Sequence, residues 1–250
     1  MKTGVLVHGC NLNIENWRHV AWGDPPNELG RMPQGMMVAL QSDAEVIVFG
    51  TGASEKTFRF GESEKTGQIL AEAEYSLEYL KLNYESLKRF SAFKRFDSFS
   101  TNEGFEETRE ALLGRITLDL ESKNTYEEIT KAGKIFASRG VEQVFLVSSP
   151  SHVVRCLRDA SAIYQHDEQF KSFADNIHAI PSRTCYEGTT AGDVVVVEPP
   201  HRPDRHVVPT HRRIQRMLML QKLGHDDLVQ LIEEFDDMLQ KYEHKYFNNG

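Results

Sequence analysis

Two short polar clusters contain the residues of this chain whose types and spacing suit chemistry. The first, Glu121, Asn124, Thr125 and Glu127, directly follows an apolar segment that ends at Leu120. Carboxylates can act as general bases or bind a divalent ion, and amide and hydroxyl groups can position ligand oxygens. The alternative is a helix cap, in which Asn124 or Thr125 binds free N–H groups and a glutamate reciprocates. Since capping does not require all four side chains, we expect at least two of them to bind a ligand.

The second cluster, Ser149, His152 and Arg155, follows the apolar residues 144–147, and Pro150 suits the first position of a helix. His152 and Arg155 are three residues apart, so they share one face of the first helical turn. An imidazole and a guanidinium beside free N–H groups favour a phosphate or carboxylate ligand. The alternative is a solvent-facing His152, with Arg155 paired to a neighbouring helix. Ser149 is expected to cap the helix or bind substrate, because an acyl-transfer nucleophile would need a GxSxG sequence that the chain lacks.

Glycines at two predicted strand ends would let the backbone approach a ligand closely. Gly9 ends the first apolar segment, and Gly50 and Gly52 end the second. Asn11 follows Gly9 closely enough to reach the same edge. These glycines are equally compatible with simple turns, since the chain has neither the GxGxxG fingerprint of dinucleotide-binding proteins nor the GxxxxGK[ST] sequence of a P-loop.

Apolar runs without alternation predict strands that are covered on both faces of a sheet. The clearest runs are residues 4–7, 45–49, 144–147 and 193–197, and weaker ones are residues 115–120 and 176–180. Helical patterns lie between them at residues 32–40, 69–87 and 125–138, and the last places Tyr126, Ile129, Ala132 and Phe136 on one face. Strands alternating with helices predict an α/β fold with a Rossmann-like, doubly wound, mostly parallel sheet. Both polar clusters then lie at the carboxyl edge of this sheet, where such folds bind ligands.

Some segments interrupt this alternation. Residues 53–67 are polar and long enough for a flap over the sheet edge, and residues 90–104 suggest an irregular excursion. The composition changes after an α/β domain at residues 1–199, and we expect residues 200–250 to form a helical extension packed on that domain. Its Arg- and His-rich passage at residues 201–216 is expected to pair with an acidic helix at residues 226–245. The alternative is that one or two of these arginines reach an anionic substrate.

Composition disfavours several classes of function. The 250 residues carry a net charge of -8, which disfavours a nucleic-acid-binding surface. No apolar run approaches the roughly 18–20 residues of a membrane span, and the chain opens on a strand-like segment rather than a signal peptide. We therefore expect no nucleic acid and no membrane as partners, and a cytoplasmic location. Cysteines and histidines lack the spacing of disulfide frameworks or zinc sites, so no metal ligand is assigned, and Cys10 alone is a candidate for reactivity.

The order of these motifs resembles the YdcF/SanA/ElyC-like domain family, long labelled a domain of unknown function. The family pattern E-S-x-N-T-x-E-N is matched at residues 121–128, with Glu128 where the family usually has Asn. The pattern T-S-x-x-H-x-x-R-A is matched at residues 148–156, with Cys156 in place of the usual Ala. The resemblance covers roughly residues 3–165.

Further family positions are matched by single residues. Gly9 corresponds to the glycine after the first strand, Arg31 to an arginine that opens the first helix, and residues 50–52 to a Gly-bearing strand end. A family glutamate in the next helix corresponds to Glu72 or Glu74. The resemblance implies a Rossmann-like fold with the matched residues at the carboxyl edge of the sheet. One branch of the family is thought to bind S-adenosylmethionine, but no general reaction is agreed for it.

The first functional hypothesis is an enzyme, a hydrolase or group transferase, that acts on a small phosphorylated or nucleotide-type metabolite. The anionic part of the ligand would be held by Arg155, His152, Arg31 and the backbone at Gly9 and Gly52. Glu127 or Glu121 would be the general base or bind a divalent cation such as Mg²⁺ or Mn²⁺, and His152 would donate the proton.

Two other hypotheses come from different classes. One is a non-catalytic or methyl-transfer-related binder of an adenosine cofactor such as S-adenosylmethionine, in which Glu121 or Glu127 would hold ribose hydroxyls. The other is a scaffold whose acidic final helix docks a partner. A homodimer that forms through the helical extension is also compatible with the sequence.

Overall fold

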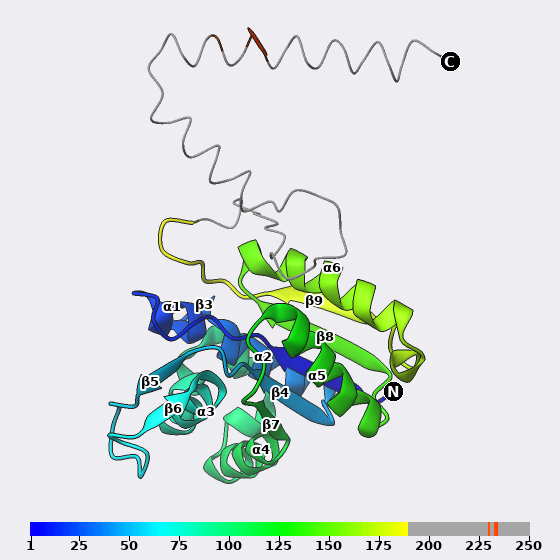
Figure 1. Cartoon of the computed structure of the whole chain (residues 1–250). Helices are drawn as coiled ribbons and strands as arrows, with labels where there is room; N and C mark the ends of the chain where they lie inside the picture. The colour runs from blue at the N-terminus through cyan, green and yellow to red at the C-terminus, as the bar shows by residue number, and fades with distance from the viewer. Residues whose placement is uncertain (190–229, 231–232, 235–250) are drawn as a thin grey trace. The chain divides into compact units, whose positions relative to one another are not determined.

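A five-stranded parallel sheet forms the centre of the α/β domain (Figure 1). The computed structural model describes residues 1–189 together with Gln230, Glu233 and Glu234. The strands are β1 (Thr3–Val7), β4 (Val46–Gly50), β7 (Ile116–Asp119), β8 (Gln143–Ser148) and β9 (Ile177–Pro181), in the order β7-β4-β1-β8-β9. Neighbouring strands are parallel throughout this sheet. The predicted α/β fold is confirmed, as are the strands predicted near these positions.

The central strands contribute to two hydrophobic cores, one on each face of the sheet. In β1, Val5 and Val7 belong to one core, whereas Leu6 belongs to the other. Ile47 and Phe49 of β4 join the first core. Because successive side chains of a strand point to opposite faces, a strand that is covered on both sides must be apolar throughout. This burial explains the uninterrupted apolar runs in the sequence.

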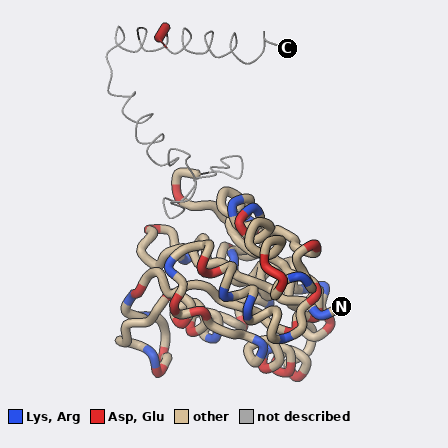
Figure 2. The backbone as a smooth tube through the Cα atoms, turned by 45° about the vertical axis from the view of Figure 1, so that its right-hand side comes forward, with Lys and Arg blue, Asp and Glu red and all other residues tan. Residues whose placement is uncertain are grey.

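Helices cover both faces of the sheet, which makes it doubly wound (Figure 1). One core includes α2 (Arg31–Ser42), α3 (Glu72–Asn83) and α4 (Asn102–Gly114), and the other includes α5 (Thr125–Ser138) and α6 (Pro150–His166). Figure 2 shows acidic and basic residues interspersed over these elements.

The predicted apolar face of α5 is confirmed in part. Ile129, Ala132 and Phe136 are buried, as the helical spacing predicted, whereas Tyr126 is 40% exposed. Each residue turns a helix by about 100°, and the buried face is centred on the line through Thr125, Ile129 and Phe136. Tyr126 therefore lies at the margin of that face.

The segment predicted as a flap and the start of the predicted helix at residues 69–87 form a hairpin instead. β5 (Glu55–Thr57) pairs antiparallel with β6 (Ile69–Ala71), and α3 begins only at Glu72. The helix ends at Asn83 and is followed by the 3-10 segment η1 (Tyr84–Arg89). The helical spacing of Leu and Tyr continues beyond both ends of α3, which is why the sequence predicted a longer helix. Residues 69–71 are not helical, because their backbone N–H and C=O groups form hydrogen bonds with β5 instead of within a helix.

Shorter elements surround this framework. The segment predicted as irregular contains the 3-10 segments η2 (Ser91–Arg95) and η3 (Asp97–Phe99), and it ends at α4, a helix that the sequence analysis missed. The remaining elements are α1 (Trp17–Ala21), the hairpin strands β2 (Gly23–Asp24) and β3 (Glu28–Leu29), and η4 (Glu168–Phe170). Among the described residues, none of the helices combines the length and apolar character needed to cross a membrane.

Strand β1 lies between β4 and β8. The chain adds β4 and then β7 on one side of β1 and later adds β8 and β9 on its other side, so the strand order reverses at β1. The connections from β1 and from β8 leave in opposite directions there, which opens a crevice at the carboxyl edge. Both predicted polar clusters follow strands of this sheet, β7 and β8. The predicted strand at residues 193–197 and the Arg- and His-rich passage at 201–216 lie outside the described residues, as does all of the predicted extension except Gln230, Glu233 and Glu234.

Candidate functional site

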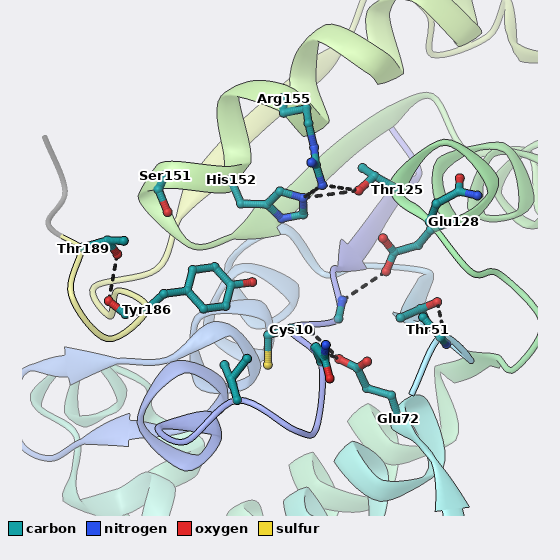
Figure 3. A pocket seen from close by; sticks show the side chains of 15 residues that line it. Cys10, Thr51, Glu72, Thr125, Glu128, Ser151, His152, Arg155, Tyr186 and Thr189 are labelled. Carbon is teal, nitrogen blue, oxygen red and sulfur yellow. Dashed lines mark hydrogen bonds between the residues drawn. The ribbon is translucent and has the colours of Figure 1, made fainter. Parts of the chain in front are cut away.

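A pocket of about 490 Å³ lies at this crevice (Figure 3), and we call it the edge pocket. Its wall is formed by the loop after β1, the loop after β4, the first turns of α3, α5 and α6, and the segment that follows β9. A volume of this size suits a small-molecule ligand. The side chains that enter it separate into two groups, a carboxylate group and a group built around Arg155 (Figure 3).

The carboxylate group consists of Glu72 and Glu128, both of which are almost fully buried. Glu128 accepts the Gly9 N–H through Oε1 at 3.1 Å and lies 2.6 Å from His8 Nδ1 through Oε2. Glu72 Oε1 accepts the N–H groups of Cys10 and Asn11, the latter at 2.9 Å. The two carboxylates therefore fix the backbone of the loop after β1.

The buried pair of His8 and Glu128 is an ion pair. Burial by itself lowers the pKa of His8, but the nearby Cys156 sulfur and the Glu128 carboxylate outweigh it and raise the pKa to about 10. His8 is therefore protonated at neutral pH and holds Glu128 in place. Its other ring nitrogen, Nε2, is buried without a hydrogen-bond partner in the described part of the chain. The His8 ring meets the His152 ring edge to face, with centroids 5.8 Å apart.

Gly50 is the residue that makes room for Glu128. A Cβ atom added to Gly50 would lie 1.8 Å from Glu128 Oε1, which is far inside van der Waals contact. A Cβ atom on Gly9 would similarly lie 2.6 Å from Glu72 Oε1. Both glycines thus permit close approach, but in the structure the approaching groups are carboxylates of the protein itself.

Substitution of Gly50 by alanine is expected to destabilise the domain by about 1–3 kcal/mol, because the new methyl group overpacks the site and displaces Glu128. Gly114→Ala is the matched control. A Cβ atom at Gly114, the last residue of α4, meets nothing within 4 Å and should raise stability by up to about 1 kcal/mol. Urea unfolding of both variants measures the difference. Equal effects of the two substitutions would contradict the proposed contact with Glu128.

The second group of the edge pocket centres on Arg155 in the first turns of α6. Its Nη2 donates to Thr125 Oγ1 at 2.8 Å and lies 2.6 Å from His152 Nε2. His152 Nδ1 lies 2.8 Å from Ser148 Oγ. Arg155 Nε is buried without a partner, and no carboxylate of the described residues lies within 4.0 Å of this guanidinium. The cation therefore faces the pocket without a counter-ion from the part of the chain that the structure describes.

His152 is a neutral imidazole in this arrangement. Burial, Arg31, Arg155 and His8 all lower its pKa well below the usual value. Because Arg155 donates to Nε2, the proton of the neutral ring lies on Nδ1, which faces Ser148. This state favours proton acceptance over the proton donation that the sequence suggested, until an anion enters and offsets the surrounding positive charges.

Arg31 lies beneath the pocket and is only 1% exposed. It donates to the carbonyl groups of His8 and Gly9, to Ser149 Oγ at 3.0 Å and to Tyr186 Oη at 2.5 Å. Each of these partners is neutral, and none of the described carboxylates pairs with Arg31. Its charge therefore adds to that of Arg155 on this side of the pocket.

The structure brings together many of the residues that the sequence analysis selected. Gly9, Asn11, Asn124, Thr125, His152 and Arg155 line the edge pocket. Gly50 lies directly against the Glu128 side chain, and Arg31 donates a hydrogen bond to Ser149. Ser149 is the N-cap residue of α6 by position, but its side chain makes no capping hydrogen bond.

Glu121, Glu127 and Gly52 do not line the pocket. Glu121 is 83% exposed and binds Lys131 Nζ at 2.5 Å, which lowers its pKa. Glu127 accepts the Lys123 N–H at 2.9 Å, and Asn124 Oδ1 accepts the Glu127 N–H at 3.0 Å. Glu127 therefore acts in the capping arrangement at the start of α5, one of the two interpretations that the sequence allowed.

Gly52 has a backbone role. Its N–H donates to the Ser122 carbonyl at 3.1 Å, and an added Cβ atom would lie 1.9 Å from the Leu120 carbonyl oxygen. It lets the loops after β4 and β7 pass closely.

Sequence analysis did not select several residues that enter or support the pocket. In the sequence, His8 has no metal-ligand spacing, Glu128 departs from the family pattern at its position, and Tyr186 lies outside every motif. Cys10 was considered for reactivity, but burial, more than its charged neighbours, raises the pKa of its thiol to about 12, which disfavours a thiolate nucleophile. A signal for Glu128 was present, since it precedes the buried Ala132 by four residues and so shares its helix face.

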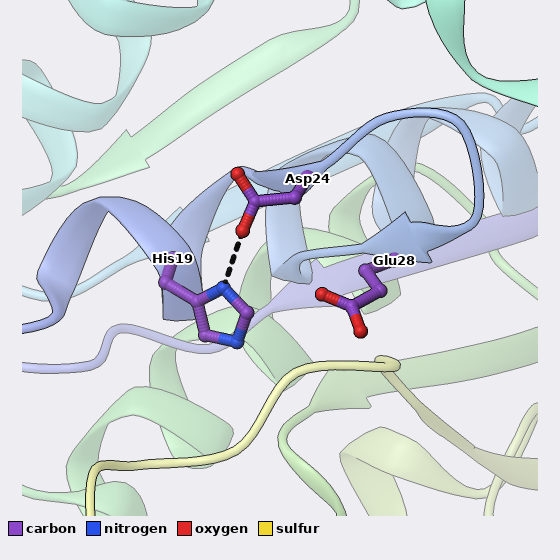
Figure 4. Close-up of side chains that lie close together, drawn as sticks. All are labelled: His19, Asp24 and Glu28. Atoms are coloured by element: carbon purple, nitrogen blue, oxygen red, sulfur yellow. Dashed lines mark hydrogen bonds and ion pairs between the residues drawn. The ribbon is translucent and has the colours of Figure 1, made fainter.

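A second cluster of potential metal ligands lies away from the edge pocket (Figure 4). His19, Asp24 and Glu28 come from α1 and the hairpin of β2 and β3, and His19 Nδ1 lies 2.8 Å from Asp24 Oδ2. Asp24 and Glu28 are exposed, and the imidazole nitrogen nearest to them is already bonded. We assign no metal site to this cluster.

The chain was compared with known proteins in three ways. No family model matches it, and no curated protein and no solved structure is found to be similar to it. The resemblance to the YdcF-like family therefore stays a hypothesis that rests on the sequence motifs alone.

Proposed function

We propose that this protein is an enzyme that acts on a small phosphorylated or nucleotide-type metabolite bound in the edge pocket. The observation that carries this proposal is the Arg155 guanidinium, which faces the pocket with a buried, unbonded Nε and without a carboxylate partner among the described residues. A guanidinium binds phosphate oxygens with paired hydrogen bonds, and partial burial strengthens that attraction. Arg31, whose described hydrogen-bond partners are all neutral, adds a second positive charge on this side.

The chemistry that we propose is hydrolysis or transfer at phosphorus. Arg155 would hold two phosphate oxygens and stabilise the charge that they carry in the transition state. His152, a neutral imidazole beside Arg155, would take the role of general base that the sequence analysis gave to Glu127 or Glu121. The oxygen of water, or of an acceptor hydroxyl, bonds to phosphorus as the ester P–O bond breaks. Its proton passes to His152 and from there to the leaving oxygen.

A divalent cation is compatible with this proposal. Glu72 and Glu128 present carboxylate oxygens to the pocket, and Mg²⁺ or Mn²⁺ commonly binds one or two carboxylates together with a substrate phosphate. The proposed experiments therefore include both metal-free and metal-containing conditions.

The same two groups also suit a second candidate, a binder of S-adenosylmethionine. That cofactor carries a carboxylate, which Arg155 could hold, and positive charges, which Glu72 and Glu128 could hold. The two candidates differ in how turnover and affinity should respond to substitutions. An enzyme should lose turnover on His152→Ala and keep most of its binding, whereas a binder should lose affinity gradually across Asn124, Glu128 and Arg155.

The proposal is tested by thermal shift against phosphorylated metabolites, nucleotides and S-adenosylmethionine, each with EDTA and with Mg²⁺ or Mn²⁺. A ligand at 100 times its Kd stabilises the folded state by about 2.7 kcal/mol. We expect stabilisation by a phosphorylated compound that Arg155→Ala abolishes. Arg139→Ala, which removes an exposed arginine at the end of α5, serves as the control and should retain it. Stabilisation by S-adenosylmethionine alone would favour the second candidate instead.

A further inference from the structure

The backbone N–H groups after β1 are already occupied by carboxylates of the protein. Glu128 accepts from Gly9, and Glu72 accepts from Cys10 and Asn11. In many α/β proteins, consecutive N–H groups in such a position form the cradle for a phosphate group. Here the anion in that cradle is Glu72, so a phosphate at this end would meet two carboxylates and no free N–H group of these three residues.

An anionic group of a ligand is therefore expected to bind on the Arg155 side of the pocket. Tyr186 adds a hydrogen-bond donor there. Its Oη accepts from Arg31 Nη2 at 2.5 Å, so its own proton is free to point elsewhere. Figure 3 shows the Tyr186 phenol entering the pocket toward His152. Burial, which outweighs the effect of Arg31, raises the pKa of Tyr186 and keeps the phenol protonated as a donor.

The opposite side of the pocket offers acceptors. An ionised carboxylate has about four lone-pair sites. Glu72 uses three of them, for Cys10, Asn11 and Ser54, whose Oγ donates at 2.8 Å. Glu128 uses two, for Gly9 and His8. Each carboxylate thus retains at least one acceptor site, and hydroxyl groups of a ligand match these sites without adding charge.

We infer that the substrate is a phosphate monoester that carries free hydroxyl groups, a sugar phosphate or a nucleoside monophosphate. Its single phosphate binds beside Arg155 and Tyr186, and its hydroxyls bind Glu72 and Glu128. A diphosphate chain is disfavoured, because its second phosphate would extend toward the carboxylates. The pocket volume of about 490 Å³ accommodates a ligand of this size. This inference rests on the proposed function and specifies its substrate class.

The test measures Kd values by calorimetry for matched ligand pairs on the 250-residue chain, in EDTA and in Mg²⁺. The probes are ribose 5-phosphate and 2-deoxyribose 5-phosphate, AMP and 2′-deoxy-AMP, ADP, and pyrophosphate. In EDTA, we expect the hydroxyl-bearing monophosphates to bind at least tenfold more tightly than their deoxy partners, and ADP and pyrophosphate at least tenfold more weakly than AMP. The better of ribose 5-phosphate and AMP identifies a sugar or a nucleotide as the source of the hydroxyls.

Two variants test which residues bind the phosphate and which bind the hydroxyl groups of the ligand. Tyr186→Phe should weaken the hydroxyl-bearing and deoxy ligands by a similar factor of about ten, because it acts on their shared phosphate. Glu72→Gln should reduce the preference for the hydroxyl-bearing ligand. Since Glu72→Gln also disturbs the loop after β1, the comparison of ligands on the unmodified protein decides the question if this variant does not fold.

The outcomes separate this inference from the proposed function. Tight binding of ADP or pyrophosphate in EDTA, or equal binding of hydroxyl-bearing and deoxy ligands there, would overturn the inferred substrate class and leave a phosphate-directed enzyme standing. Binding of none of the phosphorylated probes would contradict the proposed function itself.

Discussion

Arg31→Met is expected to lower the free energy of unfolding by about 3 kcal/mol, because it leaves buried hydrogen-bond acceptors without a donor. The side chain is 1% exposed and donates to two carbonyl groups, a serine hydroxyl and a tyrosine hydroxyl. These partners come from the loop after β1, the start of α6 and the segment after β9. For a domain of this size, such a loss lowers the Tm by roughly 6–12 °C. Calorimetry or urea unfolding measures it.

Arg115→Met provides the matched control. Arg115 is also an arginine beside the sheet, but it pairs with the exposed Asp43 at 2.8 Å and with the Ala44 carbonyl at 3.0 Å. Exposed ion pairs contribute about 0–1 kcal/mol, so this variant should be nearly as stable as the unmodified protein. If both variants lost the same stability, Arg31 would not have the structural role described here.

Glu128→Gln is expected to lower the free energy of unfolding by about 3–5 kcal/mol at pH 7, since it leaves the buried, charged His8 without its carboxylate. The loss should depend on pH. The pKa of His8 is raised to about 10 in the folded protein, so its stabilisation is complete below the unfolded pKa of about 6.5 and disappears as the pH rises through 10. Unfolding curves at several values between pH 6 and 10 should therefore show the difference from the unmodified protein shrinking as the pH rises.

Glu127→Gln tests the neighbouring carboxylate. Glu127 is exposed and contributes to the helix cap, so its loss should cost about 1 kcal/mol or less with little change between pH 6 and 10. The Glu127→Gln variant also separates the sequence hypothesis from the structural one. If Glu127→Gln abolished turnover, the general base would be the residue that the sequence analysis chose and not His152.

The difference between these adjacent glutamates shows where sequence reasoning stopped. Neighbouring residues on a helix point about 100° apart, so only one of them can face the same pocket. The buried positions Ile129 and Ala132 indicated which face α5 presents to the sheet, and Glu128 shares that face. The capping pattern and the family resemblance directed attention to Glu127 instead. The spacing of the apolar residues was sufficient to select Glu128, but the capping motif favoured Glu127.

The sequence by itself determined the features that depend on local periodicity. The strands of the parallel sheet, the start of α5 after Asn124 and the start of α6 at Pro150 were all predicted, because burial on both faces, helix capping and proline geometry act over a few residues. The carboxyl edge as the location of a site followed from the alternation of strands and helices. The proximity of His152 and Arg155 was predictable for the same reason, since helical spacing places them on one face.

Only the tertiary structure decided which distant groups meet. His8 and Glu128 are 120 residues apart and Arg31 and Tyr186 are 155 apart, yet each pair is in hydrogen-bonding contact. The placement of β1 between β4 and β8 brings these segments to one crevice. Local periodicity carries no information about which strands are neighbours, because strand order results from packing the whole sheet and its helices into one core. For that reason, the carboxylates that fill the loop after β1, and the opposed charges of the pocket, could be identified only from the structure.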